Sequence, residues 1–293
     1  SKEESIYYIY CISEDQRLTG VVSLRDLAIS DPETPIFDIA KKEIITVHPE
    51  MPEDQVAQLV SHYDFIALPV VDDKGKIIGI ITVDDILDII EEQATADIYA
   101  SAGLQESDRV YSPFSQKIIN RTPWMILNLF LAGTASFALH LFEDILGELV
   151  ILAVTKNIVT STSGNAAIQA LTITTRGLAV NDFQYISKKR VMIRETLVGM
   201  TLGFITGSLA GVTIFLLKRD VSYSIIVGLI MFLSMIATSL VACIAGVGVP
   251  IFLKKMGRDP AVGSGVIVTV ITDIFGFISF LGLATLAKPY FGL

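Results

Sequence analysis

Five long apolar stretches between residues 123 and 287 restrict what this chain can fold into more than any other feature. Each can cross the hydrocarbon core of a bilayer, which is about 30 Å thick and takes about 20 helical residues to span. The expected spans are 123–142, 149–175, 196–217, 221–253 and 260–287. Because a backbone surrounded by lipid must satisfy its own hydrogen bonds, the sequence predicts an all-α integral membrane domain of five helices over residues 122–293.

Composition separates this part from an acidic front end. Hydrophobic residues make up 52% of the chain and charged residues 18%, against about 25% charged residues in a typical soluble domain. Residues 1–104 hold 7 basic and 21 acidic residues, whereas residues 105–293 hold 15 and 10. We therefore expect a water-soluble domain ahead of the membrane domain. Its acidic surface attracts cations and repels nucleic acid, so nucleic acid is not an expected partner.

The front end contains an internal repeat. The segment GVVSLRDL at 20–27 recurs as GIITVDDI at 79–86, an offset of 59 residues. In the second copy a polar turn at 72–76 indicates a β-hairpin, and helical patterns precede it from Pro52 and follow it over 84–92. Each unit is thus predicted as strand, helix, two strands and helix. The first unit begins at its hairpin, so we expect it to be incomplete.

The repeated pattern of glycine, two apolar residues, Ser or Thr, and Asp three positions later resembles the paired CBS domain. Many members of that regulatory family bind adenine nucleotides. The resemblance implies an α/β fold over residues 1–104 and ATP as a ligand. It places Ser23 and Asp26 in one half-site, with Thr82 and Asp85 in the other. The alternative interpretation of the same residues is that each Asp caps the helix that follows it.

Basic residues in the connecting loops predict the orientation. Cytoplasmic loops carry an excess of Lys and Arg. The connections 176–195 and 254–258 are rich in them, whereas 143–148 and 218–220 hold two between them. Five spans then leave residues 1–104 in the cytoplasm and the carboxyl terminus outside. We expect a multi-pass protein of the cell membrane, with no cleavable signal peptide.

A polar segment, 105–121, joins the two parts and is too polar to span a membrane. It is either a plain linker or a juxtamembrane helix that transmits the state of the front domain to the membrane domain. We favour the connecting helix.

One carboxylate lies in the middle of the last apolar stretch. Asp273 is the only charged residue between Pro260 and Ala287. An ionisable group at that depth costs a few kcal/mol and normally faces an ion path, a water-filled cavity or a partner. The second stretch carries TSTSGNAAIQ at 160–169, which either exposes backbone carbonyls to a pore or permits close helix packing. Such oxygen ligands suit a hard cation, and Mg²⁺ would keep most of its water shell against them.

Several short motifs together carry a resemblance to a second family. They are ATADIY at 94–99, RTPW at 121–124, GNA at 164–166, DPA at 259–261 and TDIFG at 272–276. On these motifs the chain resembles the MgtE family of magnesium channels and transporters. The resemblance implies a CBS pair, a connecting helix, five spans and a homodimeric pore. The implied partners are a second copy of the chain, the lipid bilayer and Mg²⁺.

The same resemblance implies the position of an ion site. Asp273 and Asn165 line this site, and Ser161, four residues before Asn165, presents a backbone oxygen. Thr269 lies one turn before Asp273 on the same helix face, since residues four apart stack. Two copies of each helix would then surround a narrow path with carboxylates, amides and hydroxyl groups.

A group of acidic residues follows the second hairpin. Its members are Asp84, Asp85, Asp88, Glu91, Glu92 and Asp97. We expect cytosolic Mg²⁺ to act on these residues as a regulatory metal. The cytosolic halves of a dimer would repel each other at low Mg²⁺ and close together when Mg²⁺ screens them. The alternative is a solvated helix face that keeps the front domain soluble.

One residue fits the expected cation path poorly. Lys156 brings an ammonium group into the second span, where it should repel a passing cation. It faces the outer vestibule, neutralises a carboxylate, or marks an altered selectivity. The sequence leaves these three alternatives open.

The leading hypothesis is a Mg²⁺-selective homodimeric channel gated by cytosolic Mg²⁺ through its CBS domains. One alternative is a cation-coupled exchanger for another divalent ion such as Co²⁺ or Ca²⁺, and another is a CBS-linked anion channel. An enzyme is not expected. An intramembrane metalloprotease needs two histidines spaced as His-Glu-x-x-His, and His48, His62 and His140 have no such spacing.

Overall fold

The computed structural model describes residues 7–105, 107–180, 182–217 and 224–290. The loop at 218–220, which contributes to the predicted orientation, and the carboxyl terminus, which is predicted to lie outside, are not among the described residues. The chain divides into two compact units, and the division falls between Ala96 and Asp97, within one long helix.

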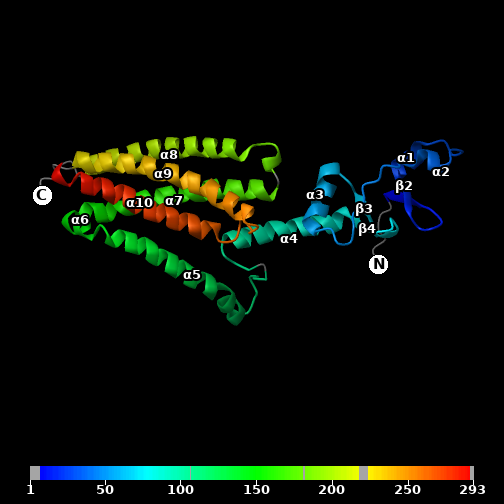
Figure 1. The fold of residues 1–293 in the computed structure, drawn as a ribbon, viewed down its shortest axis with the longest axis horizontal. Coiled ribbons are helices and arrows are strands. Elements are labelled where there is room, and N and C mark those ends of the chain that lie inside the picture. Colours follow the sequence, from blue (N-terminus) through cyan, green and yellow to red (C-terminus); the bar gives the residue numbers. More distant parts are fainter. Residues whose placement is uncertain (1–6, 106, 181, 218–223, 291–293) are drawn as a thin grey trace. The chain divides into compact units, whose positions relative to one another are not determined.

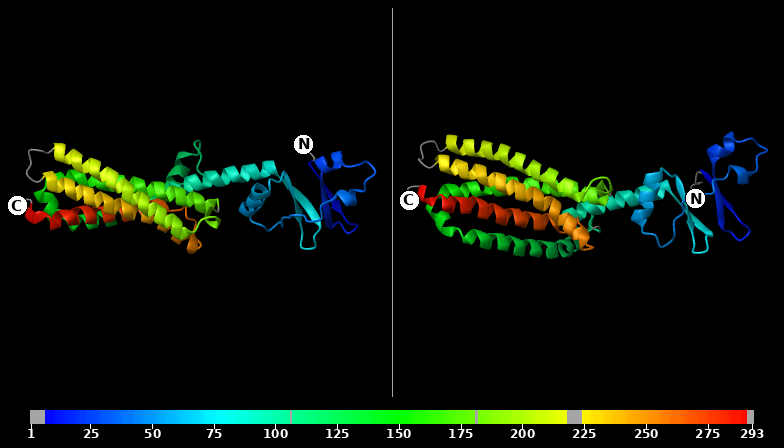
Figure 2. Two further views of the ribbon diagram at one scale, coloured as in Figure 1. Left: turned by 90° about the horizontal axis from the view of Figure 1, so that it is seen from above. Right: turned by 45° about the horizontal axis from the view of Figure 1, so that its top comes forward.

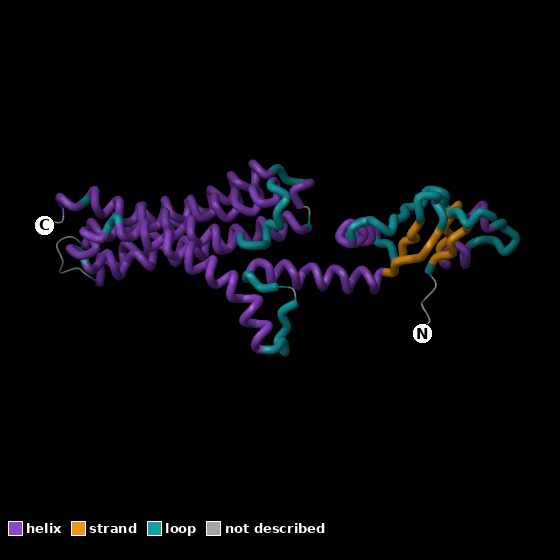
Figure 3. Tube along the Cα trace, turned by 60° about the horizontal axis from the view of Figure 1, so that its bottom comes forward, coloured by secondary structure: helices purple, strands orange, loops and turns teal. Residues whose placement is uncertain are grey.

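The first unit is an α/β domain with two short antiparallel sheets (Figure 3). Its elements are β1 (Tyr8–Ile12), β2 (Leu18–Ser23), α1 (Leu24–Ile29), α2 (Ile36–Ile39), α3 (Glu53–Tyr63), β3 (Ala67–Val71), β4 (Ile77–Thr82) and the greater part of α4 (Val83–Ser101). Its main hydrophobic core lies between α3, α4 and the second hairpin. The buried residues of that core are Val47, Val56, Ala57, Val60, Leu68 and Ile86.

The internal repeat is reproduced in the pairing of the two hairpins. Cys11 pairs with Gly20 in β1–β2, and Val70 pairs with Gly79 in β3–β4, which is the same pair shifted by 59 residues. Each hairpin has its register shift directly after that pair. Even the left-handed turn residue is repeated, because Gln16 has φ 64° and Gly75 has φ 75°. The helix, two strands and helix predicted for the second unit of the repeat are confirmed over 53–101, whereas the strand predicted before them is reduced to a single bridge between Val47 and Val70.

The second unit is a bundle of long helices (Figures 1 and 2). Its elements after α4 are α5 (Phe114–His140), α6 (Glu143–Glu148), α7 (Val150–Ala179), a 3₁₀ turn (Asp182–Gln184), α8 (Lys188–Leu217), α9 (Ser224–Lys255), α10 (Ser264–Leu286) and a second 3₁₀ turn (Lys288–Tyr290). The most buried helix is α9, which packs against α7, α8 and α10, whereas α5 packs mainly on α10.

Four of these helices, within the described residues, are long and apolar enough to cross a membrane. They are α5, α8, α9 and α10. Of the five predicted spans, only α7 lacks this signature. It is 30 residues long, but it carries Lys156, Arg176 and a run of Ser and Thr in place of apolar residues. A fifth span at α7 therefore stays a prediction.

A row of glycines brings α8 and α9 into backbone contact. Gly199, Gly203, Gly207 and Gly211 are all buried and recur every four residues along α8. A Cβ atom built on them would lie 2.6 to 2.9 Å from backbone oxygens of Ser239, Met235, Phe232 and Gly228, respectively. We call these four residues the glycine row. The two helices pack this closely because no side chain separates them, and they lie side by side in Figure 2.

The expected connecting helix at 105–121 is not a separate element. Helix α5 begins at Phe114 and continues without a break through Pro123, the predicted start of the first span. Pro123 has no backbone N–H, so the carbonyl of Ile119, four residues earlier, loses its helical donor. The Thr122 hydroxyl donates to the adjacent Ile118 carbonyl at 2.7 Å. The long helix before the bundle is instead α4. It extends to Ser101, well beyond the helical stretch expected at 84–92.

Candidate functional site

Asp273 lies on α10, near the middle of the helix, with its side chain half-buried. Within the described residues, no hydrogen bond holds its carboxylate, and no basic group lies within 4 Å of it. Carboxylates inside a membrane-spanning segment normally have a partner or face water. The Asp273 oxygens are therefore available to a ligand.

Helices α7 and α10 pack closely and run in opposite directions. Gly276 lies against Thr160, where a Cβ at position 276 would come within 2.8 Å of the threonine methyl group. One turn further along α7, Gly164 lies against the hydroxyl of Thr272. The contacts thus advance along α7 as they recede along α10, so the two helices are antiparallel.

This arrangement turns the predicted ion ligands toward one side of the contact. In two antiparallel right-handed helices, the residues directly after facing positions point to the same side. Ser161 and Asn165 directly follow the contact residues of α7, and Asp273 directly follows Thr272 on α10. Thr269 lies one turn before Asp273 on the same face. Three of these side chains are exposed in the single chain, namely Ser161, Asn165 and Thr269. Together with Asp273 they form a surface that we call the polar edge.

The hydroxyl-rich stretch of α7 is regular helix, not an unwound segment. The Thr160 hydroxyl donates to the Lys156 carbonyl, and the Ser163 hydroxyl donates to the Val159 carbonyl at 2.9 Å. The helix is continuous through Ser161, so its carbonyl lies within the helix and has one lone pair beyond the helical bond. The small residues also allow the close packing of α7 on α10, which was the other alternative. The backbone oxygen of Ser161 stays a predicted ligand, and its exposed hydroxyl is a second candidate.

The ammonium of Lys156 lies beside the polar edge. Its Nζ donates to Asn157 Oδ1 at 3.0 Å and lies 5.2 Å from the centre of the Phe277 ring on α10. Phe277 is one helical turn beyond Asp273. The ammonium is also near enough to Asp273 for electrostatic attraction. Of the three alternatives, the structure thus favours an ammonium that offsets the charge of a carboxylate.

A second group of charges surrounds Asp97 at the end of α4. Burial raises the pKa of the Asp97 carboxyl, and repulsion from Asp259 raises this pKa further. Attraction to Arg176 acts in the opposite direction but does not restore the usual value. A half-buried carboxylate that is repelled by an exposed one nearby forms a place where a cation would be stabilising.

The other acidic residues of the predicted regulatory set lie along α4. Asp84, Asp85, Asp88, Glu91 and Glu92 are exposed. In the described part of the chain, no three acidic, histidine or cysteine side chains come close enough to hold a metal ion. Any cation bound by this set therefore needs ligands from water or from a second chain.

The four predicted nucleotide ligands form two helix caps. The Ser23 hydroxyl accepts a hydrogen bond from the Asp26 backbone N–H at the start of α1. At the start of α4, Asp85 Oδ2 accepts from both the hydroxyl and the backbone N–H of Thr82, at 2.8 and 3.2 Å. The capping alternative thus holds for Asp85, which keeps one oxygen outside its cap. At α1 the cap is the Ser23 hydroxyl, and the Asp26 carboxylate instead lies 3.9 Å from the Lys41 ammonium.

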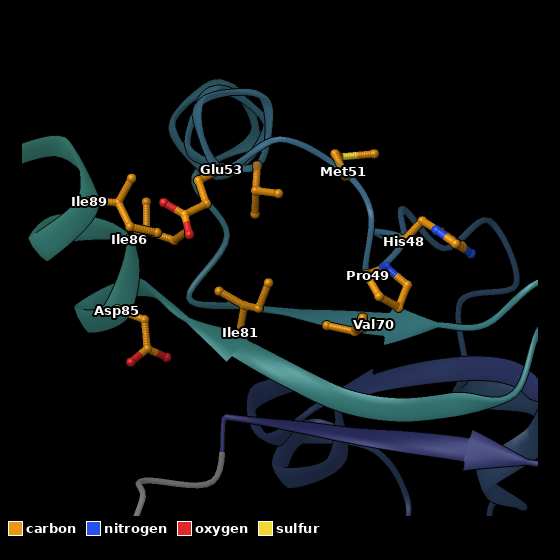
Figure 4. Close-up of a pocket in the computed structure, with 10 residues that line it drawn as sticks. His48, Pro49, Met51, Glu53, Val70, Ile81, Asp85, Ile86 and Ile89 are labelled. Atoms are coloured by element: carbon orange, nitrogen blue, oxygen red, sulfur yellow. The ribbon is translucent and has the colours of Figure 1, made fainter. Parts of the chain in front are cut away.

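A pocket of about 310 Å³ lies next to the second of these caps (Figure 4). Its lining is mainly apolar and comes from β3, β4, α3, α4 and the segment at 48–51. The lining residues are His48, Pro49, Met51, Glu53, Val56, Val70, Ile81, Asp85, Ile86 and Ile89. In Figure 4 the carboxylate of Glu53 points toward the isoleucine side chains, and that of Asp85 points away from them. An apolar pocket with a few polar groups at its margin is typical of a small-molecule site.

Two family models match the chain. Residues 157–283 match the MgtE model, described as a divalent cation transporter, and residues 36–92 match the CBS domain model. The first match includes the polar edge, and the second includes the pocket.

Full-length relatives are similar over almost the entire chain. The magnesium transporter MgtE of Enterococcus faecalis is 34% identical over 98% of this chain, and that of Thermus thermophilus is 34% identical over 97%. The chain spans 62% of the length of each of these relatives. A solved cytosolic domain of the Mg²⁺ channel MgtE in complex with ATP is 48% identical over 29% of this chain and 35% of that chain, with a TM-score of 0.29.

Proposed function

Because this chain belongs to the MgtE family of divalent cation transporters, we propose that it carries Mg²⁺ across the cell membrane. The family is one of transporters and not of enzymes. The proposed form is a homodimeric channel, with the front domain in the cytoplasm and the carboxyl terminus outside. Its proposed gate responds to cytosolic Mg²⁺ through the CBS domains.

The observation that carries this proposal is the polar edge beside Asp273. A carboxylate, an amide and two hydroxyl groups lie on one side of the contact between α7 and α10. Oxygen ligands of this kind suit Mg²⁺, which usually keeps several waters and touches few protein atoms directly. The proposed ion ligands are Asp273, Asn165, Ser161 and Thr269.

Exposure of the polar edge supports a dimer. Leaving amide and hydroxyl groups against lipid is unfavourable because lipid offers them no hydrogen bonds. A second copy with the same edge turned inward would cover both edges and enclose an aqueous path between them. Such a path would hold two Asp273 carboxylates, one from each copy.

Mg²⁺ uptake into proteoliposomes that contain the 293-residue chain tests this function. We expect saturable uptake above that of empty liposomes, with Co²⁺ and Ca²⁺ competing more weakly than Mg²⁺ itself. Current recorded across a bilayer separates the mechanisms, because a passive channel gives a current that reverses at the Nernst potential of Mg²⁺. Uptake that instead requires an opposing cation gradient would identify an exchanger, and anion current alone would overturn the proposal.

We expect Asp97→Asn to stabilise the bundle at neutral pH and to weaken its response to Mg²⁺. The raised pKa of Asp97 means that the folded state binds more protons than the unfolded state between the ordinary carboxyl pKa and the raised one. Stability is therefore present below this window, and it is lost as the pH rises through it. Removing the charge should raise the unfolding temperature at pH 7 by a few degrees.

Thermal unfolding of the purified protein, with and without millimolar Mg²⁺ at constant ionic strength, measures this effect. Mg²⁺ should raise the unfolding temperature of the original protein more than that of the variant. Asp144→Asn is the matched control, since Asp144 is an exposed acid of the same unit, on α6, and lies outside the regulatory set. An equal Mg²⁺ response in all three proteins would remove Asp97 from the regulatory set.

We further propose that the pocket beside Asp85 binds the base or sugar of an adenine nucleotide, as the CBS resemblance implies. Asp85→Ala should abolish saturable ATP binding in calorimetry, and Asp26→Ala should do the same if the first half-site contributes. Asp88→Ala is the control, because Asp88 lies one turn further along α4 and does not line the pocket. ATP binding that survives Asp85→Ala with unchanged affinity would exclude this site.

A further inference from the structure

Lys156 brings a positive charge into the region where the proposed function requires a cation path. The side chain is half-buried on α7 and reaches toward α10. Its Nζ is held by two neutral groups, the amide oxygen of Asn157 at 3.0 Å and the face of the Phe277 ring at 5.2 Å. Neither contact fixes the ammonium as a close ion pair would.

Both of these neutral groups lie in line with the proposed ion ligands. Asn157 lies one turn before Ser161 on α7, and Phe277 lies one turn beyond Asp273 on α10. The ammonium is therefore placed next to the ion site and toward the ends of α7 and α10 that face α6. In the described residues, no carboxylate lies within 4 Å of Nζ, so Asp273 attracts the ammonium without binding it directly.

The side chain keeps its charge beside the ion site. Lysine carries a compact charge on a stem of four carbons, and it keeps that stem on apolar surface while its amine seeks polar groups. The bond to Asn157 and the contact with the Phe277 ring hold the ammonium near Asp273, where it repels an arriving cation.

We propose that Lys156 is a built-in competing cation that lowers the affinity of the path for ions and reduces its preference for divalent over monovalent cations. This inference rests on the proposed function, because it assumes that ions bind beside Asp273. In a dimer, two ammonium groups would face two Asp273 carboxylates, so the empty path would carry little net charge.

Coulomb's law gives this proposal a quantitative signature. The repulsion between the ammonium and a bound ion is proportional to the charge of the ion. Removing the ammonium therefore lowers the energy of a divalent ion by twice as much as that of a monovalent ion at the same place. On a logarithmic scale the gain in affinity for Mg²⁺ is twice the gain for Na⁺.

The decisive variant is Lys156→Met in the 293-residue chain, because methionine keeps the apolar stem and loses the charge. In proteoliposomes, we expect the Mg²⁺ concentration for half-maximal uptake to fall roughly tenfold. The corresponding Na⁺ concentration, measured without divalent ions, should fall only about threefold. Lys156→Arg keeps the charge and should leave the ratio of the two concentrations unchanged.

Lys156→Gln provides a second neutral variant that retains a donor for Asn157, in case the methionine variant does not fold. The inference is overturned if both neutral variants are folded and bind Mg²⁺ and Na⁺ as the original does, or if the two affinities change by the same factor. Those results would leave Lys156 as a packing residue without touching the proposed function. Failure of the original protein to take up any cation would instead refute the proposed function itself.

Discussion

We expect Mg²⁺ uptake to fall to the background of empty liposomes when Asp273 is replaced by alanine. This carboxylate is the only charged group in α10, and no hydrogen bond holds it within the described residues. Without it, the proposed path keeps amide and hydroxyl oxygens but has no negative charge to offset the charge of Mg²⁺. Asp273→Asn should lose most of the flux as well, because the amide has nearly the same shape and lacks the charge.

The expected loss is specific to transport. Asp273 is half-buried and borders no tight contact, so the alanine variant should remain folded and keep the oligomeric state of the original in size-exclusion chromatography. Asp144→Ala is the control, since Asp144 is an exposed acid on α6, away from the polar edge. A folded alanine variant that takes up Mg²⁺ at the original rate would refute an ion site at Asp273.

Replacing Gly203 by leucine should separate α8 from α9 and destroy the bundle. A Cβ at this position would lie 2.7 Å from the Met235 carbonyl oxygen and 2.7 Å from the Ile236 Cα. Both are backbone atoms, so no side-chain rotation relieves the clash. Overpacking usually costs about 1–3 kcal/mol even where side chains can adjust, and here we expect more than about 3 kcal/mol.

Size-exclusion chromatography and thermal unfolding of the purified variants measure this loss. Gly203→Ala should lie between the original and the leucine variant, because it adds one methyl group to the same contact. Gly133→Leu is the control, since a Cβ at Gly133 on α5 would meet no atom within 4 Å. If Gly203→Leu unfolded at the same temperature as Gly133→Leu, the close packing of α8 on α9 would be wrong.

Much of the fold could be predicted because its signals are local. The repeat at an offset of 59 residues predicted two equivalent hairpins, and the apolar stretches predicted the long helices. The start of α5 could not be predicted, because Pro123 looked like the beginning of a helix. The helix continues through Pro123 with one backbone hydrogen bond fewer, and no periodic pattern in the sequence indicates that it does so.

The proposed site was predicted in its members but not in its geometry. Asp273 was identified by its position in the middle of an apolar stretch, and Asn165 was supplied by the family resemblance. The two residues lie on one side of a helix pair because α7 and α10 pack antiparallel. This is a tertiary contact, which no local sequence pattern shows. The position of Lys156 against Phe277 is tertiary for the same reason. The glycine row was missed although its signal, a glycine at every fourth position of an apolar stretch, was present in the sequence.

The glycine row also bears on how substitution tolerance in this protein is interpreted. Substitutions at its four positions should be tolerated as poorly as substitutions at Asp273, although the glycines touch no ion. The two kinds of position differ in which property of the new side chain is not tolerated. Along the row, tolerance should fall steadily with the volume of the new side chain, whether it is polar or apolar. At Asp273 it should depend on charge, with asparagine tolerated little better than leucine. Intolerance alone would therefore not distinguish a contact between two backbones from a contact with an ion, whereas its dependence on size or charge would.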